Sequence, residues 1–252
     1  MDHLEPLIRR LSASTDLDDA DIAAITTLPI RIADVPANTA IAQEGEHPAQ
    51  CCLVIKGFAI RSKTTDAGKR QILSVHIPGD IPDLQTLHLS VMDHDFKTLS
   101  DCSLGFIAHE PLQALIRARP MIAEALWRET LVDAAIFREW IVNGRRAANQ
   151  RLAHFLLEMR RRLELVGLAS NGHFQLPMTQ LDLADTVGLT PVHINRVIQS
   201  LRQDKLLEFR KYVVTLGDAD HLMKLGEFDD LYLHQSPGQE DTTGRLPSRA
   251  CG

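Results

Sequence analysis

The chain has 252 residues, of which 44% are hydrophobic and 24% charged, so it can bury one or two cores of ordinary size and is not a disordered polymer. No apolar run approaches the roughly 20 residues of a membrane span, and Asp2 and Glu5 stand where a secretion signal would be basic. These features predict a cytoplasmic protein, and the net charge of −6 excludes a uniformly basic nucleic-acid binder.

Residues 1–119 are predicted to form an antiparallel β-roll, or jelly roll, flanked by short helices. Short apolar runs alternate with glycine turns at nearly regular spacing, which is typical of such a domain. The runs are Thr39–Ala42, Cys52–Ile55, Phe58–Ile60, Gln71–Ile77 and Leu99–Ile107. Helical patterns flank these runs over Leu4–Leu11, Asp21–Leu28 and Glu110–Ala118.

The four cysteines are Cys51, Cys52, Cys102 and Cys251. None belongs to a C-x-x-C pair or to a zinc-type spacing of Cys and His. Because Cys51 and Cys52 fall within an apolar run, we expect buried, reduced thiols and no metal site. A redox-sensing thiol needs an accessible, electropositive setting that the sequence does not show.

Residues 120–146 are predicted to form a long central helix and a hinge, with Pro120 in the first turn and a break at Asn143. The helix carries two apolar stripes, and a helix that is apolar on two sides must bury both. We expect one side to pack on the roll and the other to pair with a second copy of the chain. A helix wholly buried within one domain is the alternative. The predicted dimer stripe is Trp127, Leu131, Ala134 and Ile141, and the second stripe is Val132, Ile136 and Trp140.

Two short helices joined by a tight turn are predicted within residues 147–217. Thr179 caps the first helix and forms a capping box with Asp182, and Gly188 ends it. Thr190 caps the second helix, with Pro191 in its first turn. This arrangement is the helix-turn-helix pattern.

Charge is concentrated around this pattern. Residues 141–215 carry 11 Lys and Arg against 6 Asp and Glu, whereas residues 1–140 carry 13 against 20 and residues 216–252 carry 3 against 7. One basic module between acidic flanks predicts a local contact with a polyanion.

The second helix of the pattern has a polar outer face. A helix fits the major groove of DNA, where Arg196 can bind O6 and N7 of guanine and Asn195 can bind adenine. Thr190 and the backbone N–H groups at the helix start can hold a phosphate. An ordinary helical hairpin with a polar surface is the alternative.

Residues 206–216 are predicted to form a basic two-stranded wing, with Phe174–Leu176 as a third strand. We therefore expect double-stranded DNA as the partner. The predicted DNA-contact residues are Thr179, Gln180, Thr190, Pro191, Val192, His193, Asn195, Arg196, Gln199, Arg210 and Lys211. Residues 218–252 are acidic and, toward their end, rich in Gly, Pro, Ser and Thr, so a disordered tail is predicted.

The segment Gln180–Leu207 resembles the winged helix-turn-helix of the Crp/Fnr superfamily of bacterial transcription regulators. The resemblance covers about residues 25–216 and extends to a roll of the cyclic-nucleotide-binding type. It implies an α+β protein with a sensor roll, paired central helices in a homodimer, two recognition helices in successive major grooves, and RNA polymerase as a partner. The roll residues that carry it are Gly45-Glu46, Leu53–Gly57, Gly68-Lys69 and Pro78–Asp80.

The sequence departs from this family where a ligand would bind. Members that bind cyclic AMP hold its phosphate with an Arg-Ser pair, whereas the stretch here lacks that pair and carries Asp83, Asp93 and Asp95, which would repel a phosphate. Ile136 and Phe137, at the positions that meet the base, cannot hydrogen-bond a purine. Cyclic AMP is therefore not expected as the ligand. The candidates for the effector pocket are Asp83, Leu84, His94, Asp95, Ile136 and Phe137.

Further departures from the family pattern bear on other cofactors and on the DNA half-site that is read. The cysteine spacing of the iron–sulfur members is missing, and a haem ligand among His76, His88, His94 and His109 stays open as an alternative. Val192 stands where members that read the common half-site carry glutamate, so we expect the guanine read by Arg196 to be kept and a different base at the position that the glutamate would read.

An enzyme is not indicated, because no nucleophile elbow, P-loop, dinucleotide fingerprint or H-E-x-x-H zinc motif is present. A ligand-binding or scaffold protein that does not bind DNA specifically is the alternative function. The sequence does not identify the signal, or distinguish activation from repression.

Overall fold

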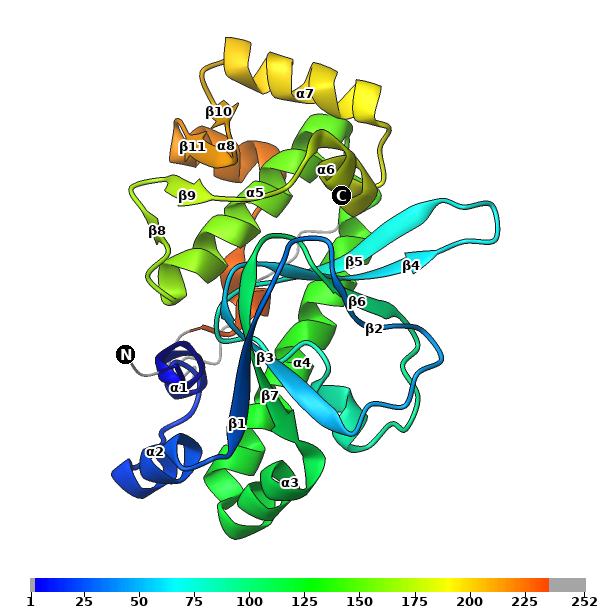
Figure 1. Cartoon of the computed structure of the whole chain (residues 1–252). Coiled ribbons are helices and arrows are strands. Elements are labelled where there is room, and N and C mark those ends of the chain that lie inside the picture. The colour runs from blue at the N-terminus through cyan, green and yellow to red at the C-terminus, as the bar shows by residue number, and fades with distance from the viewer. Residues whose placement is uncertain (1–2, 236–252) are drawn as a thin grey trace, which may run out of the picture.

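A computed structural model describes residues 3–235 of the chain. Figure 1 shows a β-roll and its helices at one end, a smaller helical domain at the other, and the long helix α4 (Pro120–Asn143) running beside both. No helix among residues 3–235 is both long and apolar enough to cross a membrane.

The roll consists of two antiparallel sheets, one in the order β1-β7-β3 and the other in the order β2-β6-β4-β5. Glycine turns join its strands, and at Gly57 (φ 91°) an added Cβ would lie 2.4 Å from the carbonyl oxygen of Asp101, so no other residue fits there. The strands are β1 (Ile30–Val35), β2 (Ala40–Ala42), β3 (Gln50–Lys56), β4 (Ala59–Thr64), β5 (Arg70–His76), β6 (Asp95–Thr98) and β7 (Cys102–Ala108).

Short helices flank the roll close to their predicted positions. They are α1 (Glu5–Ser12), α2 (Asp19–Thr26) and α3 (His109–Ala118). A 3-10 helix that was not predicted, η1 (Leu84–Leu87), follows β5. Cys51 and Cys52 are free and buried in the roll, as predicted, and so is Cys102. Burial raises the pKa of the Cys51 thiol to about 12, so that thiol is not reactive. Cys251 lies outside the described residues.

In the described part of the chain, the C-terminal domain combines four α-helices and one 3-10 helix with a four-stranded sheet in the order β10-β11-β9-β8. The break between α4 and α5 falls at residues 144–147, where the hinge is predicted. The elements are α5 (Ala148–Leu165), β8 (Ala169–Ser170), β9 (His173–Gln175), α6 (Gln180–Val187), α7 (Pro191–Gln203), β10 (Leu207–Arg210), β11 (Val213–Leu216), α8 (Ala219–Gly226) and the 3-10 helix η2 (Asp230–Leu233).

The two domains share one hydrophobic core. Ile60, Ile72 and Val75 of the roll belong to the same buried cluster as Phe155 and Leu157 of α5. At the edge of this core Arg70 of β5 pairs with Asp182 of α6 at 2.6 Å and with Asp185 of α6 at 2.7 Å. The C-terminal domain is therefore docked on the roll by both apolar packing and ion pairs.

Two expectations are corrected by the structure. Residues 218–235 are ordered rather than forming a disordered tail, because Leu222 and Leu233 are buried against α5 and α4; residues 236–252 lie outside the described part. The second stripe of α4 packs on that same segment rather than on the roll: Val132 and Ile136 share a cluster with Leu233. Residues 218–235 were predicted to be disordered because their few apolar side chains stand among acidic ones.

Candidate nucleic-acid interface

Local hydrogen bonds position α6 and α7. Thr179 Oγ1 accepts the N–H of Asp182 at 3.1 Å, and Asp182 Oδ2 accepts the N–H of Thr179 at 3.0 Å, which completes the predicted capping box. Gly188 ends α6 in a left-handed conformation, with φ at 68°. Thr190 Oγ1 then accepts the N–H of His193 at 3.2 Å and starts α7.

One face of α7 anchors it in the core. The buried side chains on this face are Ile194, Val197, Ile198 and Leu201. Burial of four large apolar side chains contributes several kcal/mol, so the opposite face is fixed toward solvent. In Figure 1, α7 lies across the outer edge of the C-terminal domain, away from the roll.

The outer face presents the predicted DNA-contact residues. All of them are exposed: Thr179, Gln180, Thr190, Pro191, Val192, His193, Asn195, Arg196, Gln199, Arg210 and Lys211. Asn195 Nδ2 donates to Gln180 Oε1 at 3.1 Å and ties α7 to α6. No acidic partner of Arg196 is found among residues 3–235, so its guanidinium is available to a base.

The wing is a β-hairpin closed by two residues. Arg210 pairs with Val213 in register, and Lys211 and Tyr212 between them have positive φ angles of 48° and 66°, the pattern of a type I′ turn. Arg210 forms an ion pair with Glu208, whereas Lys211 has no acidic partner within the described part of the chain. Lys211 is therefore the freer of the two cations.

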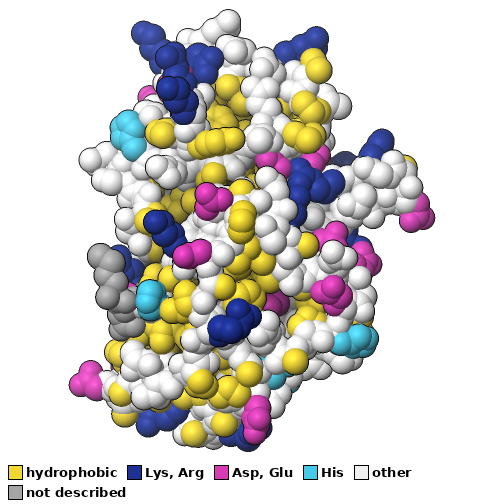
Figure 2. Space-filling model, viewed as in Figure 1, with side chains coloured by type: hydrophobic (Ala, Val, Ile, Leu, Met, Phe, Trp, Pro, Cys, Tyr) yellow, Lys and Arg dark blue, Asp and Glu magenta, His cyan; other side chains and the backbone are white. Residues whose placement is uncertain are grey.

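Basic side chains gather at this end of the molecule. Figure 2 shows Lys and Arg at the top of the view, over the C-terminal domain, while Asp and Glu are scattered over its middle and lower parts. A cluster of one sign on a single surface supplies the attraction for phosphates that is independent of sequence.

A shallow groove of about 480 Å³ lies beside α7. It is lined by Thr190, Val192 and Arg196 and, from the start of α5, by Ala148 and Asn149. Ala148 and Asn149 were not among the predicted DNA-contact residues. The helix break at the hinge could have identified them, because the first N–H groups of a new helix lack partners within the helix and can bind an anion.

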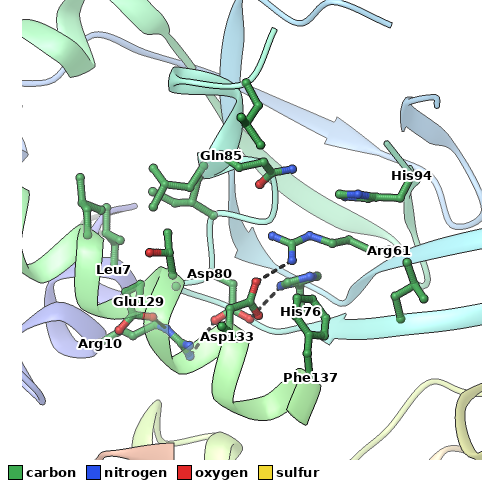
Figure 3. A pocket seen from close by; sticks show the side chains of 18 of the residues that line it. Leu7, Arg10, Arg61, His76, Asp80, Gln85, His94, Glu129, Asp133 and Phe137 are labelled. Carbon is green, nitrogen blue, oxygen red and sulfur yellow. Dashed lines mark hydrogen bonds and ion pairs between the residues drawn. The ribbon is translucent and has the colours of Figure 1, made fainter. Parts of the chain in front are cut away.

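A second cavity, of about 460 Å³, lies between the roll, α1, η1 and α4. Of the six predicted pocket residues, Leu84, His94 and Phe137 line it (Figure 3). Four further lining residues were not predicted and come from three separate elements: Arg10, Arg61, Glu129 and Asp133.

The other three predicted pocket residues point elsewhere. Asp83 is buried within the roll, where it accepts the N–H of Cys52 at 2.7 Å and where burial raises its pKa to about 7. Asp95 accepts the N–H of Glu44 at 3.1 Å. Ile136 faces away from the cavity toward Leu233. None of these three side chains lines this cavity.

Asp80 is the centre of a buried ionic network beside this cavity, which is here called the Asp80 network. Its carboxylate lies 2.7 Å from Arg10 of α1 and 3.3 Å from His76 of β5 (Figure 3). It also lies 3.1 Å from Arg162 of α5. Arg10 also pairs with Glu129 of α4. Burial would raise the pKa of Asp80, but Arg10, His76 and Arg162 hold it below its usual value.

Ser74, His76 and Asp80 lie in the order of a hydrolytic triad. Ser74 Oγ is 2.7 Å from His76 Nε2, and His76 Nδ1 is 3.3 Å from Asp80 Oδ2. However, burial lowers the pKa of His76 to about 4, and Ser74 is 2% exposed and does not line the cavity. The hydroxyl cannot meet a substrate, so the arrangement is structural. Among residues 3–235, no cluster of three His, Cys, Asp or Glu could hold a metal ion.

Comparison with known proteins identifies both halves of the molecule. A family model described as a Crp-like helix-turn-helix domain matches residues 150–225, and one described as a cyclic nucleotide-binding domain matches residues 33–119. The chain is 28% identical over 186 residues to the transcriptional activator protein FnrL of Cereibacter sphaeroides, covering 70% of this chain and 73% of that protein.

Further regulators are similar to this chain in sequence and in structure. The chain is 26% identical to the nitrogen fixation regulation protein FixK of Rhizobium meliloti, over 72% of this chain and 80% of that one. The structure of FixK2 from Bradyrhizobium japonicum superposes with a TM-score of 0.72 at 26% identity, covering 79% of this chain and 98% of that chain. Neither family model reaches beyond residue 225.

Proposed function

The chain belongs to the Crp/Fnr superfamily of DNA-binding transcription regulators, and from this premise we propose that it binds a palindromic promoter site in the cytoplasm as a homodimer and there contacts RNA polymerase. The carrying observation is α7, whose inner face is buried and whose outer face presents Asn195, Arg196 and Gln199 to solvent. Two such helices on a two-fold axis read two half-sites one helical turn apart.

A mobility-shift assay with a library of palindromes at two salt concentrations tests this proposal. A preferred sequence and a steep fall of affinity with salt are expected. Binding without sequence preference at either concentration would instead favour the scaffold alternative.

The homodimer is supported by the first stripe of α4. Trp127 is 63% exposed, Leu131 48% and Ile141 76%, and Ala134 is partly exposed. Exposure to water of large apolar side chains aligned on one helix face is unfavourable in free energy. A second copy of the same helix would remove these side chains from water.

We expect Leu131→Glu to convert the dimer into a monomer, because it places a charge in the centre of the apolar stripe. Light scattering after gel filtration measures the mass, and affinity for the palindrome should fall by at least about tenfold while a single half-site is bound as before. Leu168→Glu is the control, since Leu168 is 47% exposed but lies outside α4. A dimer that survives Leu131→Glu would contradict the predicted interface.

Part of the proposal is that cyclic AMP is not the effector. The charged groups that line the roll cavity are Arg10, Arg61, Asp80, Asp93, Glu129 and Asp133, an excess of carboxylates. Arg61, the one cation on the roll side of the cavity among the described residues, lies 2.5 Å from Asp133 and donates to the carbonyl oxygen of Pro82, so it is not free for a phosphate. No cofactor is proposed.

Lys211 is proposed to hold a phosphate without reading sequence. We expect Lys211→Ala to weaken binding to every DNA sequence by a similar factor and to reduce the salt slope, d log K/d log [salt], by about one. Titrations at four salt concentrations measure this slope. Lys56→Ala, an exposed lysine of the roll, should leave the slope unchanged. A loss confined to one sequence would show that Lys211 contacts a base.

A further inference from the structure

The last described residues form a segment that bridges the hinge. We call residues 227–235 the C-terminal strap; it follows α8 and lies beyond both family matches. Leu233 of the strap is 2% exposed and packs with Val132 and Ile136 of α4, and Phe228 and Tyr232 border the same cluster. The strap therefore covers the second stripe of the central helix.

The strap also contacts α5, on the other side of the hinge. Tyr232 Oη donates to Glu158 Oε2 at 3.0 Å, and its ring stacks on His154 with centroids 5.9 Å apart. Asp230 pairs with Arg161 of α5 at 2.7 Å. One short segment is thus packed on the two helices that the hinge joins.

Glu158 links these contacts through a single carboxylate. It is fully buried on α5, and the same Oε2 atom that accepts from Tyr232 also accepts from Trp140 Nε1 of α4 at 2.9 Å. Its other oxygen lies 3.4 Å from Arg162. Rotation of α5 against α4 would separate a buried carboxylate from its donors, which is costly.

From these contacts we propose that the C-terminal strap positions the DNA-binding domain: Tyr232 and Leu233 act together with the packing of α5 on the roll to fix the angle between α4 and α5, and thereby the distance between the two recognition helices of the dimer. The inference rests on the proposed function. Only residues 144–147 join the two helices covalently, so their angle depends on the packing around the joint. Movement away from the observed angle would also uncover Val132, Ile136 and Leu233.

The test is the affinity for palindromes whose half-site spacing is changed by one, two or three base pairs. For the native chain we expect one preferred spacing and a loss of at least about tenfold at the others. In the double variant Tyr232→Phe, Leu233→Ala this preference should flatten to within about threefold, while affinity for an isolated half-site stays the same. Tyr232→Phe alone should flatten it partly, because it removes one hydrogen bond and little volume.

Leu231→Ala is the matched control, because Leu231 belongs to the strap but is 75% exposed. It should keep the native spacing preference. If the double variant also kept that preference and only unfolded at a lower temperature, the strap would be merely structural and the inference would be overturned. If the native chain bound no palindrome specifically, the proposed function itself would fail, and the inference with it.

Discussion

Replacing Arg196 with alanine is expected to lower affinity for the cognate site by about 10- to 100-fold, equivalent to about 1–3 kcal/mol, and to abolish the preference for guanine at one position of each half-site. Arg196 lies on the exposed face of α7, next to the buried anchor Val197. Its guanidinium can donate two parallel hydrogen bonds to O6 and N7 of guanine, which no other base pair accepts in that geometry.

Arg196→Lys separates charge from geometry. Lysine keeps the positive charge but loses the planar pair of donors. The variant should retain affinity for non-specific DNA and its salt dependence, yet discriminate poorly among the four bases at that position. Competition titrations with the four single-base variants of the half-site measure this. An equal loss for all four bases on Arg196→Ala would show that the residue holds phosphate rather than reading a base.

The second large effect is expected on stability. We expect Asp80→Asn to reduce the free energy of unfolding by about 3–5 kcal/mol at pH 7, because it removes the carboxylate that Arg10 and Arg162 share, where Arg162 is buried and the Arg10 side chain is only 11% exposed. The amide has nearly the shape of the carboxylate, so the loss reports on charge and hydrogen bonding and not on a cavity.

Denaturant titration followed by circular dichroism measures this change. Asp34→Asn is the control, since Asp34 is exposed at the edge strand β1 and the substitution should change stability by less than about 0.5 kcal/mol. A cost for Asp80→Asn as small as that for Asp34→Asn would mean that the Asp80 network contributes nothing net.

The recognition segment could be predicted because its signals are local. The Thr179–Asp182 box, Gly188 and the Thr190 cap determine where α6 and α7 begin and end through contacts within four residues. The spacing of apolar and polar residues along α7 then determines which side chains face outward. The glycine turns of the roll are local in the same sense.

The parts that were missed depend on contacts far apart in the chain. Arg10, Asp80, Glu129 and Arg162 come from α1, the turn after β5, α4 and α5, and no spacing in the sequence relates them. The C-terminal strap was mistaken for a disordered tail because its few apolar residues are diluted by acidic neighbours. The second stripe of α4 was a sign that something covers that side, but it did not show what.

The core that the roll shares with α5 also affects how the chain unfolds. Ile60 and Ile72 are buried beside Phe155, so neither domain keeps an intact interior when the other unfolds. Heat or a damaging substitution in the roll should therefore melt the whole chain in one cooperative transition. Such damage removes the regulator entirely, and leaves no folded DNA-binding fragment to occupy promoters in its place.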